Sequence, residues 1–194
     1  MKLDKFYDTP DKIYIVLERC QGYELFDLLD ARRKQANAEQ SKRIWEEYEI
    51  ATIIQQVLMA VNYLHKNMIV HRDIRAENLV FVNRITGDLR LKLIDFGTAT
   101  KFDSENFLTQ AYGTPYYMAP EVAKGCYSEK ADLWSIGVLL HIMLTGKPLF
   151  TGTNKEIIQQ VINYKMMTFD GPDYKRASSG AIDLLKKLTH SDPN

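Results

Sequence analysis

Cysteine, glycine and proline are scarce in this sequence of 194 residues, which contains 2, 10 and 6 of them, and the net charge is zero. Two cysteines, Cys20 and Cys126, and four scattered histidines give neither a disulfide framework nor the paired spacing of a zinc site. The 25 basic residues equal the 25 acidic ones in number, so we expect no nucleic acid and no membrane as partners. An aromatic content of 11% argues against disorder.

Long apolar runs are also missing. The longest strongly apolar stretch, residues 134–144, is too short to cross a bilayer. The opening residues alternate charged with apolar side chains, so we expect no cleavable secretion signal. Because a domain averages roughly 150 residues, the sequence predicts one domain, or one and a piece, in the reducing cytoplasm.

Helical spacing is clear in the middle of the sequence. Apolar side chains recur at steps of three and four residues at Ile50, Ile54, Val57, Val61 and Leu64. This spacing predicts a long amphipathic helix that ends near residues 65–67. Residues 130–144 are apolar on nearly all sides, which predicts a central helix surrounded by protein. Two more helices are predicted, one after the capping box from Thr153 to Glu156 and one from Ser179.

Two segments show strand patterns. Residues 12–17 are β-branched and aromatic and follow a Thr-Pro-Asp turn, which predicts a buried strand. Residues 89–93 alternate leucine with basic residues, which predicts a strand with one buried face. Residues 31–49 are rich in charges of both signs, and we expect them to form a surface insertion. The whole pattern predicts a mostly helical body with a few short strands.

Three short motifs follow the predicted long helix. Residues 71–78 read His-Arg-Asp-Ile-Arg-Ala-Glu-Asn, residues 95–97 read Asp-Phe-Gly, and residues 113–121 read Gly-Thr-Pro-Tyr-Tyr-Met-Ala-Pro-Glu. A tripeptide such as His-Arg-Asp or Asp-Phe-Gly arises by chance in many chains. The three motifs in this order, however, resemble the catalytic loop, metal-binding loop and activation-segment end of eukaryotic protein kinases. The resemblance implies an α+β fold of the protein-kinase type, ATP and Mg²⁺ as cofactors, and protein substrates.

The chemistry of phosphoryl transfer explains these residue types, because it requires placement and charge neutralisation more than covalent help. By resemblance, Asp73 accepts or orients the substrate hydroxyl, while Asn78 and Asp95 hold Mg²⁺ as hard oxygen ligands. Thr114 would bridge the substrate-binding loop to the catalytic loop. Arg75 lies where most serine/threonine kinases have lysine, and its guanidinium can still contact the γ-phosphate.

By resemblance, the activation segment includes Arg72, Phe96, Gly97, Thr109 and Glu121. Arg72 organises this segment in the family by pairing with a phosphorylated or acidic residue. Gln110 lies where that partner is expected and is neutral, whereas Thr109 beside it would supply the charge if phosphorylated. The alternative for Thr109 is an ordinary loop threonine.

The residues after the first predicted strand resemble the hinge that binds adenine. Leu17 would guard the pocket, the backbone of Glu18 and Cys20 would form hydrogen bonds with adenine, and Leu79 would form the apolar floor. Glu24 would meet the ribose or a basic substrate residue. Cys20 has an alternative as a small buried apolar residue.

The serine/threonine type is favoured because residues 113–121 have the form of that class, although Arg75 and Ala76 together resemble one branch of tyrosine kinases. Residues 24–27 and 132–138 are similar to the calcium/calmodulin-dependent and calcium-dependent group of kinases. No EF-hand loop occurs in the sequence, so a calcium-sensing module is expected only outside this chain.

Two glutamates suggest a basophilic kinase. Glu24 and Glu77 resemble acidic positions that face arginine or lysine in a substrate, and carboxylates there would pair with a guanidinium. The alternative is that both are solvated surface residues, or that Glu24 serves only ribose.

Three other kinase features are missing from the sequence. It contains no G-x-G-x-x-G loop and no Val-Ala-Ile-Lys strand, and it lacks the family arginine that pairs with Glu121. We therefore expect a partial kinase domain with residues 1–17 as the end of the small lobe, residues 18–27 as the hinge and residues 28–194 as a truncated large (C-terminal) lobe.

Two functions stay open at this point. The first is the catalytic part of an ATP-dependent serine/threonine kinase, and the second is a non-catalytic, pseudokinase-like binding module. The presence of Asp73, Asn78 and Asp95 favours the first, because a binding module has no chemical need of all three. The missing lysine favours the second for the 194-residue chain alone, which we expect to show little turnover.

Overall fold

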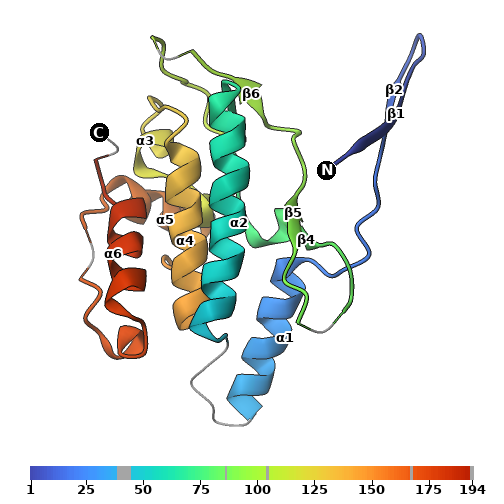
Figure 1. Ribbon diagram of the computed structural model, residues 1–194. Helices are drawn as coiled ribbons and strands as arrows, with labels where there is room; N and C mark the ends of the chain where they lie inside the picture. Colours follow the sequence, from blue (N-terminus) through green and yellow to red (C-terminus); the bar gives the residue numbers. More distant parts are fainter. Residues whose placement is uncertain (39–44, 86, 104, 167, 193–194) are drawn as a thin grey trace.

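The computed structural model describes residues 1–38, 45–85, 87–103, 105–166 and 168–192. Helices dominate, and the short strands pair two by two (Figure 1). The strands are β1 (Leu3–Asp8), β2 (Ile13–Leu17), β3 (Ile69–Val70), β4 (Leu79–Phe81), β5 (Leu91–Leu93) and β6 (Thr100–Lys101). The helices are α1 (Leu25–Ala38), α2 (Glu47–Lys66), α3 (Pro120–Ala123), α4 (Ala131–Thr145), α5 (Asn154–Ile162) and α6 (Ser179–Leu188). The expectation of a mainly helical fold with short strands is confirmed.

Helix α2 is the predicted long helix, and its apolar stripe faces the core. Its buried residues are Ile50, Ile53, Ile54, Val57, Val61 and Leu64. At its start the Glu49 side chain accepts a hydrogen bond of 2.9 Å from the backbone N–H of Glu46, which satisfies one free donor of the first turn. The helix ends at Lys66, as its spacing predicts.

Helix α4 lies at the centre of the helical body, between α2 and α6 (Figure 1). It is buried on nearly all sides, which confirms the predicted central helix. A Cβ atom at Gly137 would lie 2.7 Å from Thr189 Cγ2 and 2.9 Å from Leu188 Cβ, so glycine allows this close approach. The core is therefore centred on a helix that tolerates little change in side-chain volume.

Two capped helices complete the core. Thr153 and Glu156 form the predicted capping box at the start of α5. Helix α6 begins at Ser179 as predicted, and the Ser178 hydroxyl accepts a hydrogen bond of 3.1 Å from the N–H of Ala181. None of the helices in the described part of the chain has the length and apolarity needed to span a membrane.

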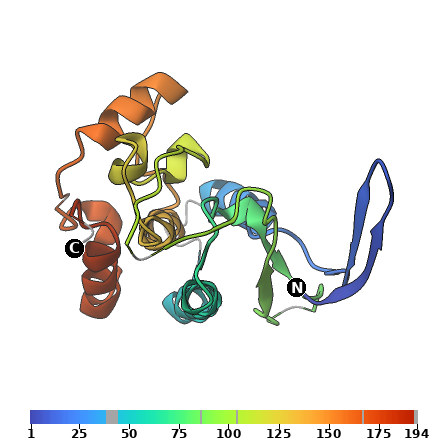
Figure 2. The ribbon, with the colours of Figure 1, turned by 90° about the horizontal axis from the view of Figure 1, so that it is seen from above.

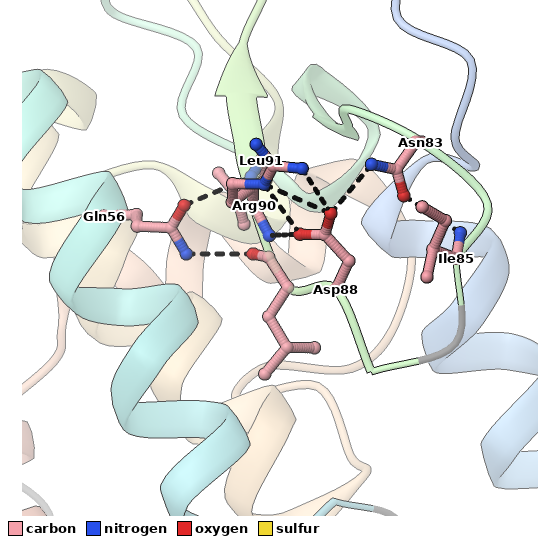
Figure 3. Close-up of polar contacts among 7 residues, drawn as sticks. Gln56, Asn83, Ile85, Asp88, Arg90 and Leu91 are labelled. Atoms are coloured by element: carbon pink, nitrogen blue, oxygen red, sulfur yellow. Dashed lines mark hydrogen bonds and ion pairs between the residues drawn. The ribbon is translucent and has the colours of Figure 1, made fainter.

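The connection between β4 and β5 contains a turn that Asp88 organises (Figure 3). Its carboxylate accepts hydrogen bonds of 2.6 Å from Arg90 Nη2 and 2.7 Å from Asn83 Nδ2. Because the guanidinium favours the charged form, it holds the pKa of Asp88 well below its usual range.

Gln56 of α2 ties this turn to the helical body (Figure 3). Its amide donates 2.9 Å to the carbonyl of Leu89 and accepts 3.2 Å from the N–H of Leu91. The strand predicted over residues 89–93 is confirmed only for Leu91–Leu93. The carbonyl of Leu89 accepts a hydrogen bond from Gln56 of α2 instead of from a neighbouring strand. The pairing of β5 with β4 therefore begins at Leu91, opposite Phe81.

The hairpin β1–β2 stands away from the helical body (Figure 1 and Figure 2). Its strands pair antiparallel, with Phe6 opposite Ile15, and both are exposed along their whole length. Ile13 and Ile15 keep 62% and 61% of their surface open. The predicted strand is confirmed, but its predicted burial is wrong. Residue type specifies an extended backbone, whereas burial needs a second layer, and none of the described elements covers this ribbon.

Most described residues of the segment 31–49 lie at the surface, as their charges predict, but the segment is not a separate insertion. Helix α1 and the start of α2 fill most of the segment, and Trp45 is buried at 3% exposure. The Arg32 guanidinium of α1 donates to both carboxylate oxygens of Glu49 in α2, over 2.9 and 3.0 Å. The high density of charged residues gave no sign that Trp45 is buried or that Arg32 pairs with Glu49. Residues 39–44 of it lie outside the described residues.

A buried polar pair joins α4 to the segment before α6. The Tyr174 hydroxyl forms a hydrogen bond of 2.7 Å with His141 Nδ1. Burial disfavours the charged imidazole and lowers the pKa of His141 to about 4 from its ordinary value of 6.5. The folded protein therefore holds His141 neutral.

Acid should destabilise the protein through His141. A histidine with a depressed folded pKa stabilises the fold fully above 6.5, its ordinary value, and this stability is lost as the pH falls toward about 4. We expect the free energy of unfolding, measured with urea, to fall by about 2 kcal/mol from this group between about pH 7.5 and about pH 5. This part of the pH dependence should vanish in His141→Gln and persist when the exposed His190 is replaced by glutamine. An unchanged pH dependence in His141→Gln contradicts the assignment.

Candidate active site

The catalytic-loop motif connects β3 to β4, and Asp132 of α4 anchors it through hydrogen bonds. The backbone N–H groups of His71 and Arg72 donate to the two carboxylate oxygens of Asp132, each over 2.9 Å. Arg72 has a φ of 69°, a region that side-chain-bearing residues rarely adopt. Two charge-assisted hydrogen bonds to one buried carboxylate stabilise this conformation.

Asp132 is a residue that motif reading did not assign. It is 1% exposed, and it also lies 2.9 Å from His65 Nε2 of α2. One carboxylate thus joins α2, α4 and the catalytic loop. The sequence offered one sign of this role, which is that Asp132 lies near the start of an otherwise apolar helix. A carboxylate that is buried in such a helix needs hydrogen-bond partners.

Asp73, Asn78 and Thr114 come together, as predicted. Asn78 Nδ2 donates to the backbone carbonyl of Asp73 over 2.8 Å and to its Oδ2 over 3.0 Å. Thr114 Oγ1 lies 3.3 Å from Asp73 Oδ1. A Cβ atom at Gly113, whose φ is 100°, would lie 2.7 Å from the Arg72 carbonyl, so glycine brings this segment against the catalytic loop. Asn78 and Thr114, which belong to different motifs, therefore both bond the Asp73 carboxylate.

Arg75 binds two other residues of the site. Its Nε donates to Glu77 Oε2 over 2.9 Å, its Nη2 pairs with Glu77 Oε1, and its Nη1 donates to Thr114 Oγ1 over 2.5 Å. The hydrogen bonds with Glu77 raise the pKa of Arg75. Burial alone would raise the pKa of Glu77, but hydrogen bonds from Arg75 lower it below its ordinary value. Both groups are thus held in their charged forms.

The residues proposed to hold Mg²⁺ are brought close together by the backbone. The N–H of Ile94 donates to the carbonyl of Asn78 over 2.9 Å, and Asp95 follows directly with a φ of 59°. Asp95 Oδ1 accepts 3.1 Å from the N–H of Gly97. Since both contacts of the Asn78 side chain use its nitrogen, its oxygen is the atom left for a cation. An amide oxygen and an exposed carboxylate are the hard ligands that Mg²⁺ prefers, so these residues fit the ion.

No group of three or more histidine, cysteine, aspartate or glutamate side chains gathers anywhere in the described ranges. The chemistry of the donor set at Asn78 and Asp95 is that of oxygen ligands alone.

The start of the activation segment packs against the catalytic loop. The Phe96 ring lies edge-on to the His71 ring, with centroids 5.0 Å apart. Arg72 Nε donates to the carbonyl of Thr98 over 2.6 Å, and its guanidinium lies 4.2 Å from the ring centroid of Tyr112. Tyr112 is a second residue that motif reading missed. Its position next to the glycine of the third motif gave no separate signal.

Thr109 and Glu121 lie elsewhere on the segment. Thr109 is exposed beside Gln110, whose carbonyl accepts 2.7 Å from the Tyr127 hydroxyl. Glu121 lies in the first turn of α3, and burial raises the pKa of its carboxyl.

The residues predicted to bind adenine lie at the edge of the body. Leu17 ends β2 and is 43% exposed, whereas Leu79 of β4 is fully buried. Lys92 of β5 forms an ion pair of 2.5 Å with Glu18, and its hydrogen bond lowers the pKa of that carboxyl. Glu24 is exposed, and its backbone forms an isolated antiparallel β-bridge with Val80.

Among the described residues, no hydrogen bond or ion pair joins Leu17, Glu18 or Cys20 to Asp73 or Asn78. Cys20 is half-buried, and its sulfur lies 3.9 Å from that of Met1. The structure therefore assembles the catalytic and metal residues and leaves Leu17, Glu18 and Cys20 apart from them.

This combination of fold and site defines a protein kinase domain. The family model described as protein kinase domain matches residues 1–194, and the chain belongs to this family. The resemblance of the three motifs is thereby confirmed.

Curated relatives of the chain include calcium-dependent protein kinases of Plasmodium species. Calcium-dependent protein kinase 4 of Plasmodium berghei is 39% identical over 188 residues, which cover 97% of this chain and 34% of the relative. The enzyme of the same name from Plasmodium falciparum is 38% identical over the same shares. Calcium-dependent protein kinase 5 of Plasmodium falciparum is 36% identical over 185 residues, or 95% of this chain and 31% of the relative. The chain spans about a third of the length of these relatives.

Proposed function

We propose that this chain is the catalytic part of an ATP-dependent protein kinase that phosphorylates serine and threonine in proteins. The observation that carries the proposal is the hydrogen-bonded group of Asp73, Asn78 and Thr114, with Asp95 next to the residue that bonds Asn78. A module used only for binding would have no chemical need of this arrangement. The names of the curated relatives support the same reading.

In this proposal each residue has a separate task. Asp73 orients the substrate hydroxyl and accepts its proton, and Asn78 fixes the Asp73 carboxylate through its amide nitrogen. The oxygens of Asn78 and Asp95 hold Mg²⁺. Mg·ATP supplies the γ-phosphoryl group and the cation that neutralises its charge. Thr114 keeps the substrate-binding segment against Asp73.

The division of the chain follows from the same proposal. Residues 1–17 would be the end of the small lobe, residues 18–27 the hinge and residues 28–194 the large lobe. Leu17, the backbone of Glu18 and Cys20, and Leu79 would then contact adenine. A cytoplasmic location and a calcium-sensing module outside this chain belong to the proposal too, the latter supported by the relatives' names.

The proposed preference for basic substrates rests on Glu24. Its carboxylate is exposed, whereas both carboxylate oxygens of Glu77 are bonded by Arg75. A guanidinium of the substrate can therefore form a charge-assisted pair at Glu24.

Phosphoamino-acid analysis tests the proposed reaction. The assay uses a restored enzyme, in which a glycine-rich loop and its lysine strand are supplied ahead of Met1, because the sequence contains neither motif. We expect phosphoserine and phosphothreonine with Mg·ATP, and an increased requirement for Mg²⁺ in Asp95→Asn, which loses the charged ligand. Mainly phosphotyrosine, or an unchanged Mg²⁺ dependence in Asp95→Asn, would contradict the proposal. The exposed Asp4→Asn change serves as the matched control.

Tyr112 should matter more for turnover than Thr109 does. The Tyr112 ring centroid already lies 4.2 Å from the Arg72 guanidinium, so Arg72 has a partner on this segment without a phosphate. In the restored enzyme we expect Tyr112→Ala to lower the turnover number roughly two- to tenfold, the range of one cation–π contact, and Tyr112→Phe to preserve it. If Thr109→Ala abolishes turnover while Tyr112→Ala has no effect, Arg72 depends on phosphorylated Thr109 instead.

A further inference from the structure

A groove of about 380 Å³ lies beside the catalytic loop, and we call it the Arg75 groove. Its charged lining residues are Asp30, Arg33, Arg75 and Glu77, and its apolar ones include Phe26, Leu29, Tyr116, Ile142 and Pro148. Thr114 also lines it, and the hydroxyl of this residue lies 3.3 Å from Asp73 Oδ1. A substrate segment that places its hydroxyl at Asp73 therefore enters this groove with neighbouring side chains.

The Glu77 carboxylate is already paired with Arg75 inside this groove. The Arg75 fork reaches both of its carboxylate oxygens, through Nε over 2.9 Å and through Nη2. The remaining Arg75 nitrogen donates to Thr114, so the guanidinium is fixed at three points. The side chains of Arg75 and Glu77 are 27% and 28% exposed, which limits the solvent that could separate them.

The second carboxylate of the groove is paired as well. Asp30 lies 2.9 Å from Arg33 Nη2 and 2.6 Å from Lys34 Nζ. Two carboxylates and two guanidinium groups thus line the groove between apolar walls, and their charges cancel. A cationic side chain entering here would lose hydration without gaining a free anionic partner.

We infer that Arg75 is a specificity-determining residue, which withdraws Glu77 from substrate recognition and makes the Arg75 groove select an uncharged side chain over a basic one. The inference rests on the proposed kinase function, since it concerns the peptide that this site would phosphorylate. A lysine at this position would not hold Glu77 in the same way, because an ammonium group cannot form the bidentate pair. The selection thus follows from the planar fork of arginine.

Peptide binding to the purified 194-residue chain tests this inference without any turnover. The probes are neutral serine peptides with arginine at each position before the serine in turn, and matched peptides with citrulline, which has nearly the shape of arginine and no charge. Fluorescence anisotropy gives the dissociation constants. The preference for arginine is the ratio of the citrulline constant to the arginine constant at each position, and Glu24→Gln identifies the position that faces Glu24.

For the wild-type chain we expect a preference for arginine only at the position that faces Glu24. Arg75→Gln should create a second preference of about tenfold, because the freed Glu77 forms a charge-assisted hydrogen bond with the peptide. The double change Arg75→Gln with Glu77→Gln should remove this gain. Glu77→Gln alone should disfavour arginine there, since the Arg75 charge is then uncompensated. Arg75→Lys, a smaller change, should give an intermediate gain.

Two results would overturn the inference. One is a wild-type preference for arginine that Glu77→Gln abolishes, and the other is no gain in either Arg75→Gln or Arg75→Lys. Urea unfolding of each variant shows that it is folded. A restored enzyme that transfers no phosphoryl group, together with the expected binding pattern, would instead refute the proposed function and leave the role of Arg75 standing.

Discussion

Asp73→Asn should lower the turnover number of the restored enzyme by about 10²–10⁴-fold, the contribution typical of a positioned acid or base. An asparagine has nearly the same shape, but its amide cannot accept the proton of the substrate hydroxyl. In the wild type Asn78 Nδ2 donates to the Asp73 carboxylate over 3.0 Å, and the side-chain oxygen of an asparagine can still accept this bond. The Michaelis constant for ATP should change little, because Asn78 and Asp95 are retained.

Steady-state kinetics with a serine peptide measure this effect. Asp8→Asn, at the exposed end of β1, is the matched control and should keep wild-type turnover. An Asp73→Asn enzyme that loses only ATP affinity, with turnover intact, would show that Asp73 binds nucleotide and does not activate the hydroxyl. Urea unfolding of both variants separates a chemical effect from a loss of structure.

Asp132→Ala should be the most destabilising single change at the site, by about 3–5 kcal/mol. The carboxylate is 1% exposed and accepts from the backbone N–H groups of His71 and Arg72. Its removal leaves these two N–H donors without a partner. It also removes the hydrogen bonds that hold Arg72 at its unfavourable φ of 69°. Turnover of the restored enzyme should also be lost, because the catalytic loop loses its anchor.

The free energy of unfolding of the 194-residue chain, measured with urea, checks the stability effect. Asp183→Ala on α6 is the control, since that carboxylate is 61% exposed and, within the described ranges, pairs with Lys187 alone. It should cost no more than about 1 kcal/mol. Equal losses for the two variants would mean that the buried contacts of Asp132 contribute nothing special.

The sequence predicted the helices that have a clear apolar period, and it failed where burial depends on distant layers. Helix α2 was predicted because its apolar residues recur at steps of three and four positions. The strand Ile13–Leu17 was predicted as buried from the same kind of residues, yet it is exposed. Local residue type determines backbone conformation well, but it carries no information on which element lies opposite.

The site divides in the same way. Asp73, Asn78 and Thr114 were found from motifs, and the structure brings them together. Asp132 and Tyr112 were missed because their roles arise only when segments about forty to sixty positions apart meet at the catalytic loop. The bonding of Glu77 by Arg75 was missed for another reason, since two residues in one loop can point in many directions.

The hairpin of β1 and β2 has a practical consequence for anyone who purifies the protein. In the described part of the chain it forms a two-stranded sheet, so the outer edge of each strand presents unpaired N–H and C=O groups. Exposed isoleucine and aromatic side chains flank those edges, and such a ribbon is a template for pairing with other chains. Losses to aggregation at high concentration would therefore arise in residues 3–17, far from the catalytic loop, and a charged side chain at Ile13 is the first remedy to try.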